Sequence, residues 1–287
     1  MFSPKFILLQ LTVFSIFKTA ILYGEIPQNP SPFYLPCVAH RGFSAIKPEN
    51  TMIAMKAGIE VGADGNEMDV RLSADGIPFL IHDDSLKRYT GEQINPCKLT
   101  IKELQTRDVG SHKSAAFKGE PIPTLDEIIA IHVGTKTIPV IELKQDGMEA
   151  QTLEVLKKYN MVKKSVIIAF SANACKKMRE LEPDIFIAWL SQCKKNEPLD
   201  VYAERIIRTC KDCNINAVDM QHGEVNREIV EKLHSAGLTV LCWTVDQPER
   251  MRQCIAAGVD SITTNRPDKL LEILKEKEKE KAPVASR

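Results

Sequence analysis

The stretch from Val38 to Asp83 concentrates side chains that could act on a phosphate ester. It carries two histidines, an arginine and two carboxylates two residues apart, in the order His40, Arg41, Glu67, Asp69 and His82. Histidine transfers protons near neutral pH, arginine binds phosphate oxygens, and carboxylates bind metal ions. The stretch therefore predicts phosphate-ester chemistry at a metal.

Glu67 and Asp69 lie in a strand-like run, where residues two apart point to the same face. Two carboxylates on the inward face of a strand are costly without a cation. Glu142 and Lys144 share one face of a second such run, VIELK. Three carboxylates from two strands suit Ca²⁺ or Mg²⁺, whereas zinc favours thiols and imidazoles, which neither motif contains. We expect one Ca²⁺ or Mg²⁺ ion as the cofactor.

The two histidines each follow a short apolar run, in the motifs His40-Arg41-Gly42 and His82-Asp83. In a barrel enzyme the active site lies where the strands end. A histidine there can transfer protons, Arg41 can donate to a phosphate, and Gly42 lets the backbone approach closely. Asp83 could orient an imidazole or close a turn. We therefore interpret both histidines as catalytic, and the other histidines as structural.

Strand-like and helix-like runs alternate along the chain. The strand-like runs are Cys37–Ala39, Asn66–Val70, Pro78–His82, Ile138–Leu143, Val166–Phe170, Ile185–Leu190, Ala217–Met220, Thr239–Val245 and Ser261–Thr263. The helix-like runs are Asn50–Val61, Leu125–His132, Met148–Tyr159, Ala172–Leu181, Val201–Lys211, Asn226–Ala236, Glu249–Ala257 and Lys269–Lys279. Such alternation with short loops predicts a parallel sheet with crossover helices.

The number of these units favours a closed (β/α)₈ barrel of the TIM type, in the α/β class, over a doubly wound sheet. Nine strand candidates compete for eight places, and the turn signal at 74–76 suggests that Pro78–His82 forms a hairpin or loop strand. Residues 84–123 show little helical or strand period apart from Ile101–Gln105. We expect them to form a small insertion over one end of the barrel.

The chain ends differ in composition from this region. Within residues 1–24, MFSPK carries one lysine and is followed by the apolar run FILLQLTVFSIF, which is typical of a secretory signal peptide and too short for an ordinary membrane span. We expect export, with an uncleaved membrane anchor as the alternative and that segment as the sole membrane contact. A Pro-rich leader (25–36), one domain (37–275) and a charged tail (276–287) follow. Equal numbers of acidic and basic residues, 38 each, give no field that attracts nucleic acid.

Eight cysteines in an exported chain permit disulfides, but a chain of this length does not need a disulfide scaffold. Cys210 and Cys213 form an isolated C-x-x-C motif. Zinc would need a second pair of ligands. We interpret the two as half-buried thiols near a helix end, with one local disulfide as the alternative.

Taken together, the motifs resemble those of the glycerophosphodiester phosphodiesterase family. They are AHRG with PENT, GAD with ExDV, DG with HD, IPTLDEII, IELK, and WTV with GVDSITTNRPD, and they run in family order from Val38 to Leu270. The resemblance implies a TIM barrel with an insertion after the HD motif. It also implies a site of acid–base histidines His40 and His82, metal ligands Glu67, Asp69 and Glu142, phosphate-binding Arg41 and Lys144, supporting Glu49 and Asn50, and a groove lined by Trp243.

The implied reaction is metal-dependent hydrolysis of a glycerophosphodiester to an alcohol and glycerol 3-phosphate, through a cyclic phosphate. The insertion would shape one side of the substrate groove. Asn66, Met55 and Asn265 depart from common family residues. We expect Asn66 to face the helix layer, and none of the three to touch the metal or histidine set.

Two other functions are consistent with a barrel of this type. A phospholipase-D-like enzyme acting on lysophospholipids should expose an apolar rim. The insertion is polar, as in RDVGSHKSAAFKGE, which favours a soluble, deacylated diester. A non-catalytic phosphodiester-binding barrel would be expected to have lost acid–base or metal residues, and all of them are present.

Overall fold

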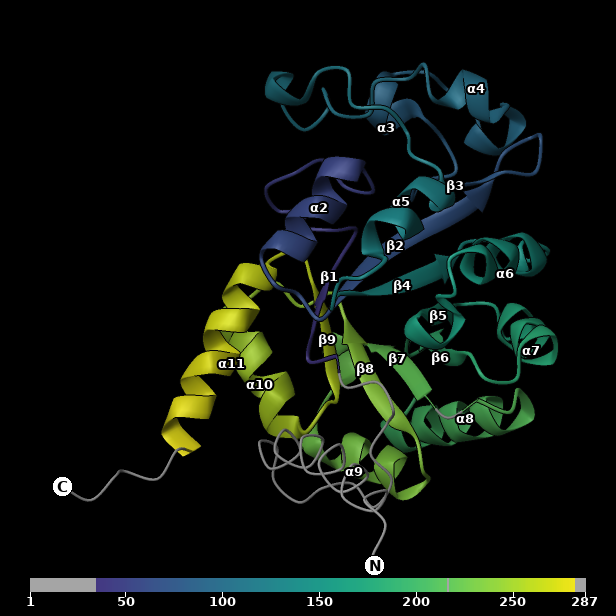
Figure 1. Cartoon of the computed structure of the whole chain (residues 1–287). Helices are drawn as coiled ribbons and strands as arrows, with labels where there is room; N and C mark the ends of the chain where they lie inside the picture. Colours follow the sequence, from purple (N-terminus) through teal and green to yellow (C-terminus); the bar gives the residue numbers. More distant parts are fainter. Residues whose placement is uncertain (1–34, 216, 282–287) are drawn as a thin grey trace, which may run out of the picture.

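Short buried strands alternate with amphipathic helices in the computed structural model, which describes residues 35–215 and 217–281 (Figure 1). The strands are β1 (Cys37–Ala39), β2 (Gly65–Leu72), β3 (Pro78–Leu80), β4 (Ile138–Leu143), β5 (Val166–Ala169), β6 (Phe186–Ser191), β7 (Ala217–Gln221), β8 (Thr239–Trp243) and β9 (Ser261–Thr264). Several predicted strands extend further than the observed ones, because their last residues leave the sheet for the loops at the barrel mouth.

The sheet closes on itself. Its strand order is β1-β9-β8-β7-β6-β5-β4-β2-β3, and β1 also pairs with β2. Every pairing within the ring is parallel, whereas β3 pairs antiparallel with β2. The eight-stranded barrel is therefore confirmed. Pro78–Leu80 is the additional ninth strand, and it forms a hairpin with β2 as predicted.

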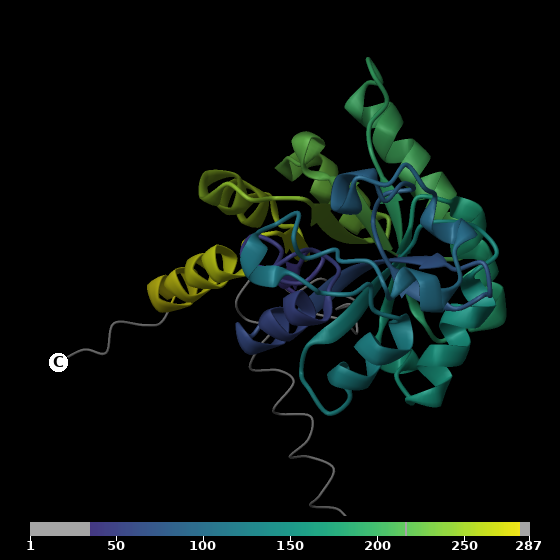
Figure 2. The ribbon, with the colours of Figure 1, turned by 90° about the horizontal axis from the view of Figure 1, so that it is seen from above.

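The helices lie around the outside of the barrel, as the view from above shows (Figure 2). They are α2 (Met52–Glu60), α5 (Leu125–His132), α6 (Glu149–Lys158), α7 (Ala172–Leu181), α8 (Leu199–Asp212), α9 (Arg227–Ser235), α10 (Pro248–Ala257) and α11 (Pro267–Lys281). Local signals set their boundaries. Thr124 and Glu127 form a capping box at the start of α5, and Gly258, with φ 92°, ends α10 in the left-handed conformation.

Two hydrophobic layers hold the barrel together. The inner layer contains residues such as Val38, Val140, Ile168 and Leu190, which alternate with outward-facing neighbours on their strands. A larger outer layer lies between strands and helices. Towards the carboxyl ends of β2 and β4 the inward positions become charged, so the barrel interior changes there from a packed core to a polar site.

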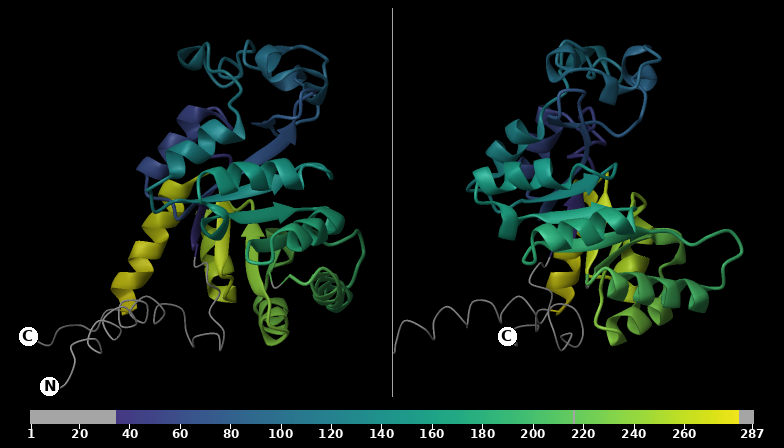
Figure 3. Two further views of the ribbon diagram at one scale, coloured as in Figure 1. Left: turned by 45° about the vertical axis from the view of Figure 1, so that its right-hand side comes forward. Right: turned by 90° about the vertical axis from the view of Figure 1, so that its right-hand side faces the viewer.

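The insertion has a small core of its own. Residues 84–123 include α3 (Lys87–Thr90) and α4 (Ile101–Leu104), each only four residues long, together with the 3₁₀ turns Pro96–Lys98 and Ala115–Phe117. Leu86, Tyr89, Leu104 and Ile122 pack there against Phe79 of β3. Helices this short show no sequence period, which is why the pattern predicted little structure. The insertion stands over the end of the barrel to which β2 points (Figures 1 and 3).

All eight cysteines lie within the described residues, and all are free thiols. The alternative of a local disulfide between Cys210 and Cys213 is therefore wrong. Their sulfurs instead approach the carbonyl oxygens of Ala217 and Ala172. Residues 1–24, predicted as a signal peptide, and most of the leader lie outside the described residues. Among the described helices none is long and apolar enough to cross a membrane.

Gly42 brings the loop after β1 against α2. Its φ is +75°, and a Cβ at this position would lie 2.5 Å from the main-chain carbon and oxygen of Ala54. This close approach holds Arg41 beside β2, since the Gly42 amide donates to the carbonyl oxygen of Glu67 at 3.2 Å. No larger residue fits here without moving either the loop or the helix.

Replacing Gly42 should therefore destabilise the protein more than replacing a glycine that has the same backbone conformation in open space. We expect Gly42→Ala to lower the free energy of unfolding by about 2–4 kcal/mol, from left-handed strain plus overpacking. Gly62→Ala is the matched control, because Gly62 has φ +84° and nothing within 4 Å of the added Cβ. Urea denaturation that gave equal losses for both variants would refute the steric explanation.

Candidate active site

Three carboxylates converge inside the mouth of the barrel. Glu67 and Asp69 come from β2, and Glu142 comes from β4, where it is the register partner of Asp69. One oxygen of each lies within 4.8 Å of the others, and all three side chains are buried. The same-face argument from the sequence is thus confirmed in space, because all three point inward.

These carboxylates differ in their protonation. Burial opposes ionisation of Asp69, but Arg41 and Lys144 outweigh it and hold the pKa of Asp69 well below its usual value. Burial, with the charges of Asp69 and Glu142, raises the pKa of Glu67 well above its usual value. Burial and Asp69 also raise the pKa of Glu142 to about 7. Arg41 and Lys144 therefore stabilise the ionised form of Asp69 but do not offset burial and carboxylate repulsion at Glu67 and Glu142.

The geometry of the cluster fits a divalent cation. Oε1 of Glu67 is buried without a hydrogen-bond partner among the described residues, and Oδ1 of Asp69 makes no hydrogen bond there, only an ion pair with Lys144. Buried polar atoms are rarely left in this state. A hard cation would be coordinated by both oxygens. It would also relieve the repulsion that helps to raise the pKa values of Glu67 and Glu142. The all-oxygen donor set agrees with Ca²⁺ or Mg²⁺ and does not separate them.

Two cationic side chains border the cluster. Nε of Arg41 lies 3.1 Å from Oδ2 of Asp69, and Nζ of Lys144 lies 2.7 Å from Oε1 of Glu142 and 3.3 Å from Oδ1 of Asp69. The main-chain amide of Arg41 also donates to Oε2 of Glu67 at 2.8 Å. Both cations therefore line the cavity beside the carboxylate cluster.

Asn50 fixes Asp69 from the other side. Its amide nitrogen donates to Oδ2 of Asp69 at 2.7 Å, and its amide oxygen accepts from the Asp69 main-chain amide at 3.0 Å. Asn50 itself has φ 56°, and its own amide donates to the carbonyl oxygen of Arg41. The PENT loop is thus a support for the site, as predicted.

His40 is held by a residue for which the sequence predicted no such role. Nδ1 of His40 lies 2.8 Å from Oδ1 of Asn265, whose amide nitrogen donates to Asp246 at 2.7 Å. Because Asp246 accepts from the nitrogen end, the oxygen of Asn265 faces His40 and accepts its Nδ1 proton. The expectation that Asn265 does not touch the histidine set is therefore wrong.

This contact leaves Nε2 of His40 facing the cluster, 3.8 Å from Oε2 of Glu67. Burial, together with the charge of Arg41, lowers the pKa of His40 to about 4, so the imidazole is neutral at pH 7. A neutral imidazole with a free Nε2 lone pair can accept a proton.

His82 is held in the same way by a carboxylate. Nδ1 of His82 lies 2.8 Å from Oδ1 of Asp83. Arg88 in turn donates from Nε and Nη2 to the two oxygens of Asp83, at 2.8 and 3.0 Å. These hydrogen bonds from Arg88 help lower the pKa of Asp83 to about 2. Of the two predicted roles for Asp83, orientation of the imidazole is the one that the structure supports.

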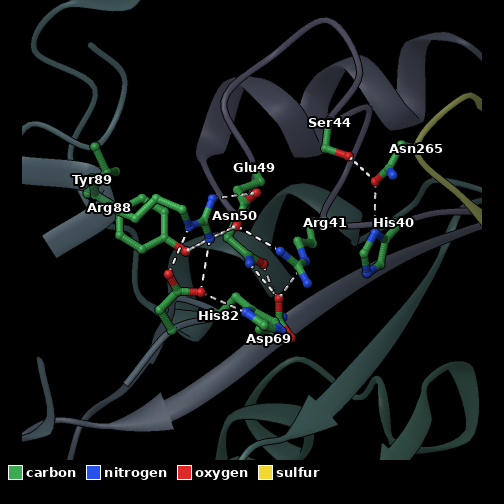
Figure 4. Close-up of polar contacts among 12 residues, drawn as sticks. His40, Arg41, Ser44, Glu49, Asn50, Asp69, His82, Arg88, Tyr89 and Asn265 are labelled. Carbon is green, nitrogen blue, oxygen red and sulfur yellow. Dashed lines mark hydrogen bonds and ion pairs between the residues drawn. The ribbon is translucent and has the colours of Figure 1, made fainter. Parts of the chain in front are cut away.

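Arg88 joins both halves of the site to the insertion (Figure 4). Besides Asp83 it contacts Glu49 at 2.7 and 3.1 Å, and Glu49 accepts from Nη1 of Arg41 at 2.9 Å. The hydroxyl of Tyr89 also donates to Glu49, at 3.0 Å. One residue of α3 therefore orients His82 through Asp83 and Arg41 through Glu49. Sequence reasoning missed Arg88 and Tyr89, because nothing in a short irregular segment marks a side chain that reaches back to the barrel.

A cavity opens between these groups. Its lining consists of His40, Arg41, Glu67, His82, Glu142, Lys144, Ile168, Phe170, Leu190, Asp219, Trp243, Thr244 and Thr263. Trp243 thus lies in the wall of this cavity, and its contact with substrate stays a prediction. None of these lining residues belongs to 84–123, all of which the structure describes, so the insertion acts on this cavity through Arg88 and Tyr89.

The remaining histidines have structural partners. Nε2 of His132 lies 3.1 Å from the amide nitrogen of Asn66, which also donates to the carbonyl oxygen of Met55. Asn66 thus faces the helix layer, as expected. His234 pairs with Asp260 at 2.8 Å, and His222 contacts Arg250.

Comparison with known proteins agrees with the fold. The model of the glycerophosphoryl diester phosphodiesterase family matches residues 40–269. A glycerophosphodiester phosphodiesterase of Caldanaerobacter subterraneus is 32% identical over 244 residues, which cover 83% of this chain and 97% of that protein. Human glycerophosphodiester phosphodiesterase 1 is 29% identical over 240 residues, with 74% and 72% covered.

The solved structures give the same result. A phosphodiesterase of Oleispira antarctica, in complex with the product sn-glycerol-3-phosphate, superposes with a TM-score of 0.74 at 27% identity, covering 84% of this chain and 98% of that one. The matched segment of this chain contains His40, Glu67, Asp69, His82 and Glu142. The chain therefore belongs to the glycerophosphoryl diester phosphodiesterase family.

Proposed function

We propose that this chain hydrolyses glycerophosphodiesters to an alcohol and glycerol 3-phosphate, with one bound Ca²⁺ or Mg²⁺. The observation that carries the proposal is the buried cluster of Glu67, Asp69 and Glu142 in one cavity with two imidazoles whose Nδ1 atoms are already engaged. Membership of the family and the glycerol 3-phosphate bound by the Oleispira relative support the same substrate class.

The cation would be held by Glu67, Asp69 and Glu142. When bound, it supplies positive charge that acidifies a nearby hydroxyl and opposes the negative charge growing on the phosphate. Arg41 and Lys144 add to that charge from the protein side, and both are already oriented by Asp69. Preorganised charge of this kind is usually the largest catalytic contribution.

The two histidines move the protons. One Nε2 takes the proton of the glycerol 2-hydroxyl, whose oxygen attacks phosphorus, and the other protonates the departing alcohol. A water molecule then opens the resulting cyclic phosphate to glycerol 3-phosphate. Asn265 and Asp83 accept the Nδ1 protons, so the base acts through the lone pair of its Nε2, and the acid must be an imidazolium that carries a second proton on Nε2. Glu49 and Asn50 keep Arg41 and Asp69 in place.

The substrate class can be tested directly. We expect hydrolysis of glycerophosphocholine to choline and glycerol 3-phosphate in the presence of Mg²⁺ or Ca²⁺, measured by product identification across a series of metals, with lysophosphatidylcholine as the competing substrate. Faster turnover of lysophosphatidylcholine would favour the phospholipase-D-like alternative. Absence of turnover of both with every divalent ion would favour a binding barrel.

The histidine roles predict large losses without unfolding. His40→Ala and His82→Ala should each lower kcat by about 10²–10⁴-fold, the usual contribution of a positioned acid or base. Thermal denaturation and metal binding should stay close to wild type, because neither imidazole is in the carboxylate cluster. His222→Ala is the control, since His222 contacts Arg250 rather than the cavity. Near wild-type kcat in either active-site variant would refute the scheme.

The metal site predicts a change in stability that does not depend on activity. Saturating Mg²⁺ or Ca²⁺, at 100-fold above Kd, should stabilise the wild type by about 2.7 kcal/mol and raise Tm by roughly 5–10 °C. Glu67→Gln should lose most of this increase. The metal-free variant should be as stable as wild type or more so, because the change removes a buried carboxyl repelled by Asp69 and Glu142. An equal metal-induced shift in both proteins would exclude Glu67 as a ligand.

A further inference from the structure

Asp219 is a fourth carboxyl group in the cavity, with no role in the scheme above. It lies in β7, two residues after Ala217, which belongs to the inner layer of the barrel. Alternation along the strand therefore points Asp219 inward, and it lines the same cavity as His40, Glu67 and Trp243. The same-face argument that identified Glu67 and Asp69 would also have identified this residue.

The surroundings of Asp219 give it no partner. Its register neighbours on β6 and β8 are Leu190 and Leu241, and both are buried. Asp219 is 1% exposed, and its Oδ1 has no hydrogen-bond partner among the described residues. The indole of Trp243 donates to the main-chain oxygen of Asp219, not to the carboxyl group. A buried, unpaired carboxyl destabilises the fold, so stability alone does not account for an aspartate here.

Asp219 also stands apart from the metal cluster. The three clustered carboxylates come from β2 and β4, whereas β5 and β6 separate β4 from β7 around the barrel. Burial, with the charge of Glu142, raises the pKa of Asp219 well above its usual value. Burial thus favours the protonated form of the carboxyl group, which can both donate and accept a hydrogen bond. A neutral hydroxyl is the natural partner for such a group among apolar neighbours.

The proposed function determines which hydroxyl is available, and the inference rests on it. When the phosphate of a glycerophosphodiester is bound at Arg41 and Lys144, the far end of its glycerol extends across the cavity. That end carries the primary hydroxyl, and the wall between consists of Ile168, Leu190 and Trp243, which suits the glycerol carbons. The head-group alcohol varies in size and must leave as product, so it fits the open side of the cavity better than the enclosed side.

We propose that Asp219 binds the free primary hydroxyl of the glycerol and so selects deacylated glycerophosphodiesters over lysophospholipids, in which this hydroxyl is acylated. The residue determines substrate preference, whereas the histidines and the metal perform the reaction. It accounts for the polar atom left unpaired in an otherwise apolar part of the wall.

The test combines variants of Asp219 with a substrate that lacks the primary hydroxyl group. Wild type, Asp219→Leu and Asp219→Asn are assayed on glycerophosphocholine and on 2-hydroxypropyl phosphocholine, which keeps the 2-hydroxyl but has no primary hydroxyl. Wild type should prefer glycerophosphocholine in kcat/KM by roughly 10- to 100-fold, as for a buried hydrogen bond. Asp219→Leu should reduce this ratio to near one, with little loss on the deoxy substrate. Asp219→Asn, which keeps a donor and an acceptor, should retain a preference.

Two further measurements separate selection from other roles. Asp219→Leu should have a Tm equal to or above that of wild type, because it removes an unpaired buried polar group. Its metal concentration for half-maximal activity should be unchanged. Equal losses on both substrates, or a raised metal requirement, would overturn the inference. If wild type hydrolysed neither substrate, the proposed function would fail as well, whereas an unchanged substrate ratio in Asp219→Leu would defeat the inference alone.

Discussion

The repulsion among three buried carboxylates is the constraint on which the site depends. Glu67, Asp69 and Glu142 lie within 4.8 Å of one another with little access to water. Arg41 and Lys144 offset this repulsion at Asp69, but leave Glu67 and Glu142 with raised pKa values. The fold tolerates this arrangement because closed β-strands fix the three positions rigidly. The remaining imbalance is what would bind a divalent ion tightly and place it beside the phosphate-binding cations.

Each reactive group is positioned by a partner from a distant part of the chain. Asp246 orients Asn265, which holds His40, and Arg88 orients Asp83, which holds His82. Arg88 also reaches Arg41 through Glu49. The insertion therefore fixes side chains of the barrel site through Arg88 and Tyr89, although it does not line the cavity. A change in its packing would move the His82 imidazole and the Arg41 guanidinium together.

Features of the fold and site could be predicted from the sequence when they depend on residues close together in the chain, and not when they depend on distant ones. The period of two placed Glu67 and Asp69 on one face, and the alternation of strands and helices predicted the closed barrel. The same period should have included Asp219, but no motif drew attention to it. Arg88 and Asn265 could not be assigned, because their roles rest on contacts across 39 and 225 positions of the sequence. The short helices of the insertion left no period to detect.

Calorimetric titration of the protein with Mg²⁺ or Ca²⁺ near pH 7 tests the metal site most directly. Repeating the titration in buffers of differing ionisation enthalpy measures the protons released on binding. The structure predicts one ion per chain, with release of protons from carboxyl groups whose pKa values are raised. Binding should strengthen as pH rises. A double variant, Glu67→Gln with Glu142→Gln, should show neither saturable binding nor proton release. Binding of equal strength in the double variant, or no binding to wild type, would contradict the account.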